Sequence, residues 1–407
     1  MKNRSGKNVA AGLVFILILA AAGPAAAFTY RVSNGAQLER ALSRAKPGDA
    51  IEVADGRYAV TVVFGRSGTA QRPIVLRAAN DGEAIIDATG RDTALVHEGK
   101  THIEIHGLVF ENAANGPQAE QAMARPGSHW TLRRCIFQNA TGAGLGLADV
   151  RHVRILGGAV RHNGQIGAGV SGSRDVLFRD TVFAHNNRGF DTEAEIDAAR
   201  ITEKVKHDGR WYTNPAWEGG GVKVSSSTNV VFEAVEAHNN HGPALWIDYA
   251  CTNITLTGCH AHHNRSVNEG WQGMGIMVEY NADGPITVTN NRIQANEGVG
   301  LGIAESQAVL IEKNHLIDDE LEFRDMDRPE SSLGSVEVRR NTFERSAVTT
   351  SLGQWDRGSG QTKRLTIDEN RWIGPVRYEW AGETFGDLDA VRAELGFETS
   401  SVVSERP

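Results

Sequence analysis

Short apolar strands recur along the chain, and each follows a polar turn that ends in asparagine. Successive turn asparagines are about 24 residues apart, with longer intervals at two places, and they are Asn139, Asn163, Asn187, Asn240, Asn264 and Asn296. A coil of that length holds three short strands and buries its apolar face only by stacking on the next coil. The repeat therefore predicts an all-β fold, a single-stranded right-handed parallel β-helix.

Apolar residues occupy the second and fourth positions of the strand that follows each turn. These strands are GLGL (144–147), GAGV (167–170), GVKV (221–224), ALWI (244–247), GIMV (275–278) and GLGI (300–303). Side chains of a strand alternate between its two faces, so these positions should point into the coil and the first, third and fifth should point outward. Leucine-rich and helical solenoids are the competing repeat class, but a period of two with β-branched residues favours strands.

A helix is predicted at each end of the stack, where edge strands need a cover. The first is an N-terminal capping helix that begins at Asn34 and has apolar residues at helical spacing, namely Leu38, Ala41, Leu42 and Ala45. The second runs from Asp387 to about Leu395 and is stopped by Gly396. We expect residues 375–407 to form a C-terminal cap and tail.

The first 27 residues have the pattern of an export signal. Basic residues precede an apolar run over 9–22, and small residues follow at the expected cleavage site, Ala25-Ala26-Ala27. We expect a signal peptide over 1–27, a secreted or periplasmic mature chain, and one β-helix domain over 28–407 without a membrane span. A membrane anchor is the alternative, which the short run and the absence of a charged stop disfavour.

Composition excludes several classes of protein. Apolar residues make up 40% of the chain and charged residues 23%, which excludes a disordered chain. The net charge of −8, without a basic run, gives no electrostatic reason to expect a nucleic-acid partner. Three cysteines cannot all pair with one another, and we predict no structural disulfide. The oligomeric state is not indicated.

The outward positions of the aligned strands contain the candidate chemistry. The third positions are Gly146, Gly169, Lys223, Trp246, Met277 and Gly302, and the fifth are Ala148, Ser171, Ser225, Asp248, Glu279 and Ala304. Small residues at both ends and larger ones in the middle predict an open groove. Lys223, Asp248 and Glu279 are the candidate catalytic residues. The alternative is that they form ordinary exposed ion pairs.

Two insertions precede the strands that carry these residues, over 190–217 and 266–273. Long loops on a rigid scaffold are commonly functional, and aromatic side chains suit the apolar faces of sugar rings. The candidate substrate-binding tryptophans are Trp211, Trp217, Trp246 and Trp271. The alternative is that tryptophans of the insertions pack within their own loops.

Histidines recur two residues before the turn asparagines. Arg161, His185, His238 and His262 are expected to stack there, with His162 and His263 beside them. A metal cluster is one interpretation, and solvated turn histidines are the other. His238 is the candidate proton donor to the groove.

Two stretches resemble known families. Residues 38–87, with ALSRAKPGDAIEVADGRY, GTAQRPIVLRA and EAIIDATG, resemble the entry segment of secreted β-helix polysaccharide lyases, the alginate and chondroitin lyase family. NNRGFDT (186–192) and EGGGVKV (218–224) resemble the two central motifs of family-nine pectate lyases. The second resemblance implies calcium at Asp191 and a catalytic base at Lys223. Glu193 and Glu218 are the further candidate calcium ligands.

The leading hypothesis is β-elimination on a uronate-containing polysaccharide. Lys223 would remove the proton next to the carboxylate, while calcium or Arg188 neutralises that carboxylate. A uronate epimerase would use similar chemistry. A glycoside hydrolase with Asp248 and Glu279 as paired carboxylates, and Glu218 or Asp191 as a third member, is the second hypothesis. A non-catalytic glycan-binding or surface protein is the third.

Overall fold

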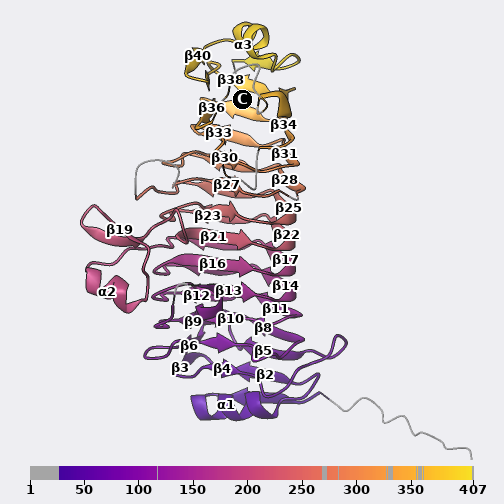
Figure 1. The fold of residues 1–407 in the computed structure, drawn as a ribbon. Coiled ribbons are helices and arrows are strands. Elements are labelled where there is room, and N and C mark those ends of the chain that lie inside the picture. Colours follow the sequence, from indigo (N-terminus) through magenta and orange to yellow (C-terminus); the bar gives the residue numbers. More distant parts are fainter. Residues whose placement is uncertain are drawn as a thin grey trace, which may run out of the picture.

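The structure is a computed structural model that describes residues 27–405 except 117, 268–272, 283, 327, 329–332, 354, 356–359 and 361. All of the expected signal peptide before residue 27 lies outside the described residues. The chain winds into an elongated stack of coils with three parallel sheets (Figure 1). The parallel β-helix predicted from the repeat is confirmed.

Among the described residues every sheet has thirteen strands, and each coil contributes one strand to each sheet except at the C-terminal end of the second sheet, where Glu383–Phe385 pairs antiparallel with Tyr378–Trp380. The first sheet consists of β1 (Thr29–Val32), β2 (Ala50–Val53), β5 (Ile74–Ala78), β8 (Ile103–His106), β11 (Trp130–Arg133), β14 (Arg151–Leu156), β17 (Arg174–Arg179), β22 (Thr228–Glu233), β25 (Thr252–Thr257), β28 (Ile286–Thr289), β31 (Val309–Glu312), β34 (Val336–Arg339) and β37 (Leu365–Asp368). The second sheet consists of β4 (Val62–Val63), β7 (Leu95–Val96), β10 (Ala124–Arg125), β13 (Leu145–Ala148), β16 (Ile166–Ser171), β21 (Gly220–Ser225), β24 (Leu245–Ile247), β27 (Ile276–Glu279), β30 (Leu301–Ala304), β33 (Glu320–Arg324), β36 (Ala347–Ser351), β39 (Tyr378–Trp380) and β40 (Glu383–Phe385). The third sheet consists of β3 (Gly56–Tyr58), β6 (Ala84–Asp87), β9 (Leu108–Glu111), β12 (Ile136–Gln138), β15 (Ala159–Arg161), β18 (Val182–Ala184), β23 (Glu236–His238), β26 (His260–His262), β29 (Arg292–Gln294), β32 (His315–Ile317), β35 (Thr342–Glu344), β38 (Arg371–Ile373) and β41 (Val402–Ser404).

The register of the second sheet agrees with the alignment made from the sequence. Lys223 of β21 pairs with Gly169 of β16 on one side and with Trp246 of β24 on the other, and Trp246 pairs with Met277 of β27. The neighbouring positions, such as Val222 and Val224, are fully buried in the core. Period-two alternation therefore separates a continuous apolar interior from an outward column of varied side chains.

Asparagines form a buried ladder at the turn between the third and second sheets. Each side-chain amide donates to the side-chain oxygen of the next asparagine at 2.8–3.1 Å, in the order Asn163, Asn186, Asn240, Asn264 and Asn296. The assignment of Asn187 to this ladder was wrong, since Asn186 lies one coil of 23 residues after Asn163. Asn187 instead accepts from the backbone N–H of Thr213 and donates to the carbonyls of Thr213 and His241.

Helices lie at both ends of the stack, where they were predicted (Figure 1). α1 (Gly35–Arg44) packs on the first coil, and its N-cap Asn34 accepts a hydrogen bond from the backbone of Gln37. α3 (Leu388–Leu395) starts after the N-cap Asp387 and ends at Gly396, whose φ of 75° is in the left-handed region. Two single turns of 3-10 helix, η1 (Ala119–Gln121) and η2 (Thr362–Arg364), lie in loops.

One lobe projects from the side of the stack (Figure 1). This side lobe, residues 190–217, is the larger predicted insertion and contains α2 (Glu193–Ala198), β19 (Lys204–His207) and β20 (Arg210–Thr213). β19 and β20 form an antiparallel hairpin. The side lobe directly precedes β21 in the chain, so it lies beside the outward face of the second sheet, which carries Lys223.

The cysteines and the lengths of the helices are two further features of the fold. All three cysteines are buried and free, as the sequence predicted. Burial raises the pKa of Cys135 and Cys251 to about 12, so their thiols are protonated at neutral pH. Within the described part of the chain, each helix is too short or too polar to traverse a lipid bilayer.

Candidate functional site

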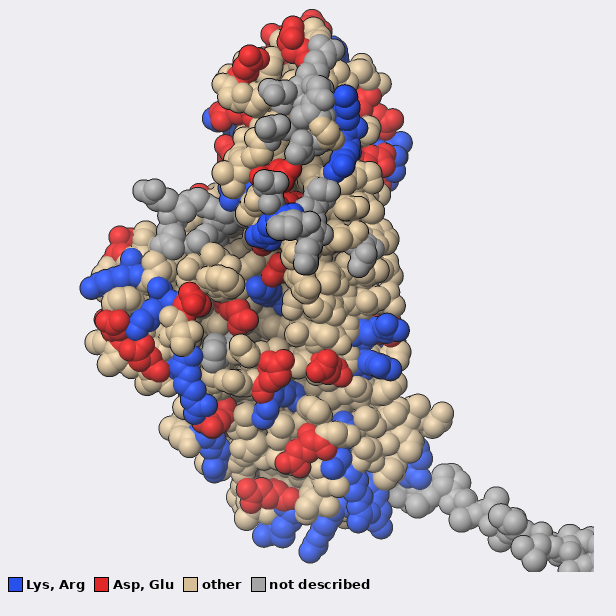
Figure 2. Space-filling view, in the orientation of Figure 1, with Lys and Arg blue, Asp and Glu red and all other residues tan. Residues whose placement is uncertain are grey.

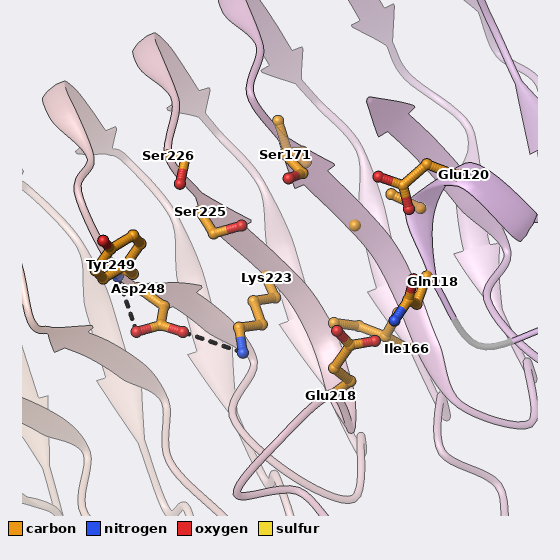
Figure 3. A pocket seen from close by; sticks show the side chains of 13 residues that line it. Gln118, Glu120, Ile166, Ser171, Glu218, Lys223, Ser225, Ser226, Asp248 and Tyr249 are labelled. Atoms are coloured by element: carbon orange, nitrogen blue, oxygen red, sulfur yellow. Dashed lines mark hydrogen bonds and ion pairs between the residues drawn. The ribbon is translucent and has the colours of Figure 1, made fainter. Parts of the chain in front are cut away.

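A groove of about 370 Å³ crosses the outward face of the second sheet. Residues of β16 and β21 and the two residues that follow β24 form its floor, and the turn around η1 forms one rim (Figure 3). Its polar lining residues are Gln118, Glu120, Ser171, Glu218, Lys223, Ser225, Ser226, Asp248 and Tyr249. Figure 2 shows acidic and basic side chains close together around the hollowed surface beside the side lobe.

Lys223 lies on the floor of this groove with three partners. Its Nζ is 3.0 Å from Oδ2 of Asp248 and donates to the carbonyl of Trp217 at 2.6 Å. The same atom lies 3.9 Å from the centre of the Trp246 ring, within the range of a cation–π interaction. Of the described residues that line the groove, Lys223 is the one cation, and its side chain and that of Asp248 are each 17% exposed.

Trp246 supports Lys223 from below. It is 2% exposed and packs with Met274, Met277 and Ala304. Its ring is therefore part of the floor under the lysine and is not open for stacking on a sugar, contrary to the expectation from its outward position. Its Nε1 is buried and has no hydrogen-bond partner within the described part of the protein.

Glu279 lies one coil beyond Asp248 but outside the groove lining. It is 6% exposed, and Arg328 covers it by donating to its Oε1 at 2.6 Å. Arg328 also pairs with the fully buried Glu305 at 3.3 Å. Burial raises the pKa of Glu279, and the nearby charge of Asp248 raises it further. Lys223, Asp248 and Glu279 thus occur on neighbouring coils, but only Lys223 and Asp248 line the open groove.

Glu218 faces Lys223 across the groove floor (Figure 3). Burial raises the pKa of its carboxyl group, and the charge of Lys223 partly opposes that shift. Glu218 also lines a second hollow of about 200 Å³ between the groove and the side lobe. The other residues of this second hollow are Gln118, Gln165, Ile201, Thr202, Glu203, Thr213 and Trp217.

His238 does not reach the groove. It lies in β23 on the third sheet, across the turn of the asparagine ladder, and its ring stacks on that of His262 at 5.0 Å. The register also corrects the predicted histidine column, because Ala184 and not His185 pairs with His238. His185 is one position further along and stacks on His162.

The predicted calcium ligands are not brought together. Asp191 pairs with Arg210, and Glu193 pairs with Lys204, so both carboxylates of the side lobe already have cationic partners. Glu218 lies in the groove. Among the described residues, the one group of three metal-ligand side chains with converging atoms is elsewhere, on the third sheet. These residues do not fit a calcium site.

The remaining predicted binding residues belong to the side lobe and its surroundings. Arg188 packs over the ring of Phe190 at 5.5 Å and does not line the groove. In the hairpin, the ammonium groups of Lys204 and Lys206 lie over the ring of Trp211, at 5.5 and 5.7 Å from its centre. Trp217 is 58% exposed at the edge of the second hollow. Trp271, with most of the smaller insertion 266–273, lies outside the described residues.

Sequence reasoning missed the residues that come from other parts of the chain. Gln118 and Glu120 belong to the loop between β9 and β10, and Arg328 follows β33. Tyr249, 49% exposed, lies two residues after the end of β24 and stacks on Tyr280. Tyr249 could have been found from the sequence, because it is an aromatic residue next to the outward Asp248. Nothing in the sequence marked the loop residues as part of the site, since loops from different coils meet only after the chain has folded.

Two protein-family models match the sequence of this chain. The model of the right-handed β-helix region matches residues 122–321 and 212–371, which together exceed half of the chain. The chain belongs to the right-handed β-helix family. The chondroitinase B family model matches residues 32–141, which agrees with the resemblance of the entry segment. No curated protein sequence matched the chain significantly.

Solved structures of this fold resemble the chain at low sequence identity. The A-module of mannuronan C-5 epimerase AlgE6 from Azotobacter vinelandii has a TM-score of 0.61 at 15% identity, over 92% of this chain and 94% of that chain. The AlgE4 A-module from the same organism has a TM-score of 0.55 at 13% identity, over 93% and 98%. A lacto-N-biosidase from Eubacterium ramulus has a TM-score of 0.51 at 11% identity, over 85% and 68%. These likenesses show the fold of the right-handed β-helix family.

Proposed function

We propose that this protein is a carbohydrate-active enzyme that cleaves a uronate-containing polysaccharide by β-elimination, with Lys223 as the base. The observation that carries the proposal is the position of Lys223, between Asp248 and Glu218 on the floor of an open groove. Gly169 precedes Lys223 in the outward column and lies against Ala119 of η1, so the η1 turn bounds the groove on that side. The chondroitinase B match of the entry segment and the mannuronan epimerase folds support an acidic glycan substrate.

The proposed step begins at the carbon next to the uronate carboxylate, C5. The neutral amine of Lys223 takes the C5 proton, and the electron pair of that bond forms the double bond between C4 and C5. The C4–O bond breaks, and its electrons stay on the departing glycosidic oxygen. Glu218 supplies a proton to that oxygen.

Glu218 suits the role of acid because its raised pKa keeps its carboxyl group protonated to a higher pH than an exposed glutamate. It faces the groove from the side opposite Asp248 (Figure 3). In its neutral form it is also a hydrogen-bond donor and adds no negative charge beside an anionic substrate. Asp248 holds the Lys223 side chain at the floor in the free enzyme.

A glycoside hydrolase is the second candidate, and one observation favours it. Glu279 lies next to Asp248, and burial is the main cause of its raised pKa. A pair of carboxyl groups whose environments differ in this way is typical of glycosidases. Arg328 covers Glu279 in this structure and would have to move before that carboxylate could meet a substrate. The lyase proposal requires no such rearrangement.

The experiment compares the activities of three forms of the protein on a panel of uronate and neutral polysaccharides. Lys223→Ala should lower kcat by about 10²–10⁴-fold on the cleaved uronate polymer, because it removes the base. The control is Lys313→Ala, which removes a lysine paired with Glu312 on a different sheet. Full turnover by Lys223→Ala would remove Lys223 from the mechanism, and cleavage confined to neutral glycans would favour the hydrolase.

A further inference from the structure

A cluster of metal-ligand side chains lies on the third sheet, which the proposed function does not use. Glu236 comes from β23, and His260 and His262 come from β26 of the next coil. The register pairs Glu236 with His260, and His262 is two residues further along the same strand and on the same outward face. One ligand atom from each of the three side chains lies within 4.8 Å of the others.

We propose that Glu236, His260 and His262 bind a divalent transition-metal ion of the zinc class. Two imidazoles and one carboxylate form a common ligand set for zinc, whereas calcium prefers oxygen ligands. Nε2 of His262 is 3.2 Å from Oε1 of Glu236. Two ligands of a tetrahedral zinc ion are separated by about 3.3 Å at the usual bond lengths, so this pair already has the required spacing.

His260 provides an independent observation. Its Nε2 is buried and has no hydrogen-bond partner within the described part of the protein. A buried polar atom without a partner is unfavourable and calls for a ligand that satisfies it.

His262 is held by a second histidine. Its Nδ1 is 2.8 Å from Nδ1 of His263, so one of these rings donates to the other. If His262 donates through Nδ1, the lone pair of its Nε2 faces the carboxylate of Glu236, and a cation between the two satisfies both. Such a hydrogen bond to the far nitrogen is the usual support of a metal-binding histidine. The competing arrangement, in which Nε2–H of His262 donates to Glu236, needs no metal.

One cation lies close to the cluster. Arg292 pairs with His260 from the following coil and would repel a metal ion. Its guanidinium donates two hydrogen bonds to Gln294 Oε1, at 3.1 and 2.7 Å, so part of its hydrogen-bonding capacity is already used. The carboxylate of Glu236 offsets part of the repulsion and is exposed, so an ion can enter from solvent.

The bound ion would cross-link two coils. β23 leads through the asparagine ladder to β24, which carries Trp246, and β26 leads to β27, which carries Met277. A ligand that binds the folded chain raises its stability by mass action. We therefore expect zinc to raise the melting temperature while the chemistry remains at the groove on the second sheet.

Zinc titration of the full mature chain, produced without a histidine tag and treated with a chelator, tests the proposal. Competition with a chromophoric zinc chelator should show one strong site per chain, and Co²⁺ should give the visible absorption of a low-coordinate site. His260→Ala, His262→Ala and Glu236→Gln should each weaken zinc binding by roughly tenfold or more, because each removes one ligand. The matched control is His315→Ala, which removes a histidine paired with Glu344 on the same sheet and should leave zinc affinity unchanged.

Three results would overturn the metal site. They are the absence of a zinc site, equal affinity in the wild type and the cluster variants, and an equal loss of affinity in His315→Ala. Each cluster variant should also lose the zinc-dependent rise in melting temperature while it keeps the melting temperature of the metal-free wild type. The last comparison shows that the variant is folded, so a loss of zinc binding reports on the ligands.

Discussion

Nζ of Lys223 lies 3.0 Å from Oδ2 of Asp248, across the boundary between two adjacent coils. The two residues are 25 positions apart in the sequence, and parallel pairing of β21 with β24 brings them together. This ion pair holds the lysine at the floor of the groove. It also means that the lysine must lose its proton before it can act as a base.

The first prediction concerns Asp248. Asp248→Asn removes the charge of the carboxylate that pairs with Lys223 but keeps a side chain of similar size. At its optimum, kcat should stay within about tenfold of the wild type, because the lysine and not the carboxylate reacts with the substrate. The measurement is kcat on the cleaved polysaccharide from acid to alkaline pH.

Asp318→Asn is the matched control, because it removes a carboxylate that pairs with Arg345 on the outside of another turn. Its pH profile should match that of the wild type. A loss of about 10²-fold or more in Asp248→Asn at every pH would contradict the lysine base and indicate that the Asp248 carboxylate itself reacts.

The second prediction concerns Trp217, an exposed ring at the edge of the second hollow. Trp217→Ala should raise KM by up to about tenfold with little change in kcat, because stacking on a sugar contributes to binding and not to the chemical step. Phe28→Ala removes an aromatic ring of similar exposure near the first coil and should leave KM unchanged. An unaltered KM in Trp217→Ala would exclude the ring from substrate binding.

The third prediction separates two neighbouring asparagines. Asn186→Ala interrupts the buried ladder between Asn163 and Asn240 and should lower the free energy of unfolding by about 1–3 kcal/mol. Asn187→Ala removes the hydrogen bonds to Thr213 and should loosen the side lobe, with faster proteolysis there than in the β-helix. Chemical denaturation and limited proteolysis measure the two effects. Equal destabilisation by both variants, with cleavage outside the side lobe, would refute this division.

The fourth prediction concerns Asp319, which continues the asparagine ladder. It accepts from the backbone N–H and the side-chain amide of Asn296, and burial raises its pKa to about 8 from the usual 3.8. Between these values the folded state holds a proton that the unfolded state has lost, so the free energy of unfolding falls as pH rises. Asp319→Asn removes this proton uptake and should stabilise the protein by about 1–3 kcal/mol at alkaline pH.

The gain from Asp319→Asn should shrink as pH falls toward and below 4, because the carboxyl group then becomes protonated in the unfolded state as well. Melting temperatures of wild type and variant at several pH values test this trend. A gain that is constant across pH would show that the buried carboxyl group does not control the effect.

Much of the scaffold could be predicted because its physical rules are local and repeated. Strand alternation and the 24-residue spacing predicted the column in which Lys223, Trp246 and Met277 are stacked. The spacing failed at the double asparagine, where Asn186 and Asn187 fit the polar turn equally well and only the coil length of 23 residues decides. Helix ends were predictable because their caps are specified by single residues such as Asn34 and Gly396.

The candidate site was harder to predict because strand alternation shows which way a side chain points but not whether other side chains cover it. Trp246 and Glu279 point outward from their strands, yet both are covered, one by Lys223 and the other by Arg328. These covers are long side chains whose conformations depend on tertiary contacts. The histidine pattern likewise suggested a metal cluster, in a column that included His262. The side chains that converge in the structure are those of His260, His262 and Glu236, and the sequence pattern did not include His260 or Glu236.

The most direct test of the central claim measures two products in one digest of a uronate polysaccharide. New reducing ends report every cleavage, and the ultraviolet absorbance of a conjugated C4–C5 double bond reports elimination. The account predicts that both signals grow in equal amounts with the wild type and that both are lost in Lys223→Ala. Reducing ends without the absorbance would show hydrolysis and contradict the assignment of Lys223 as the base of a lyase.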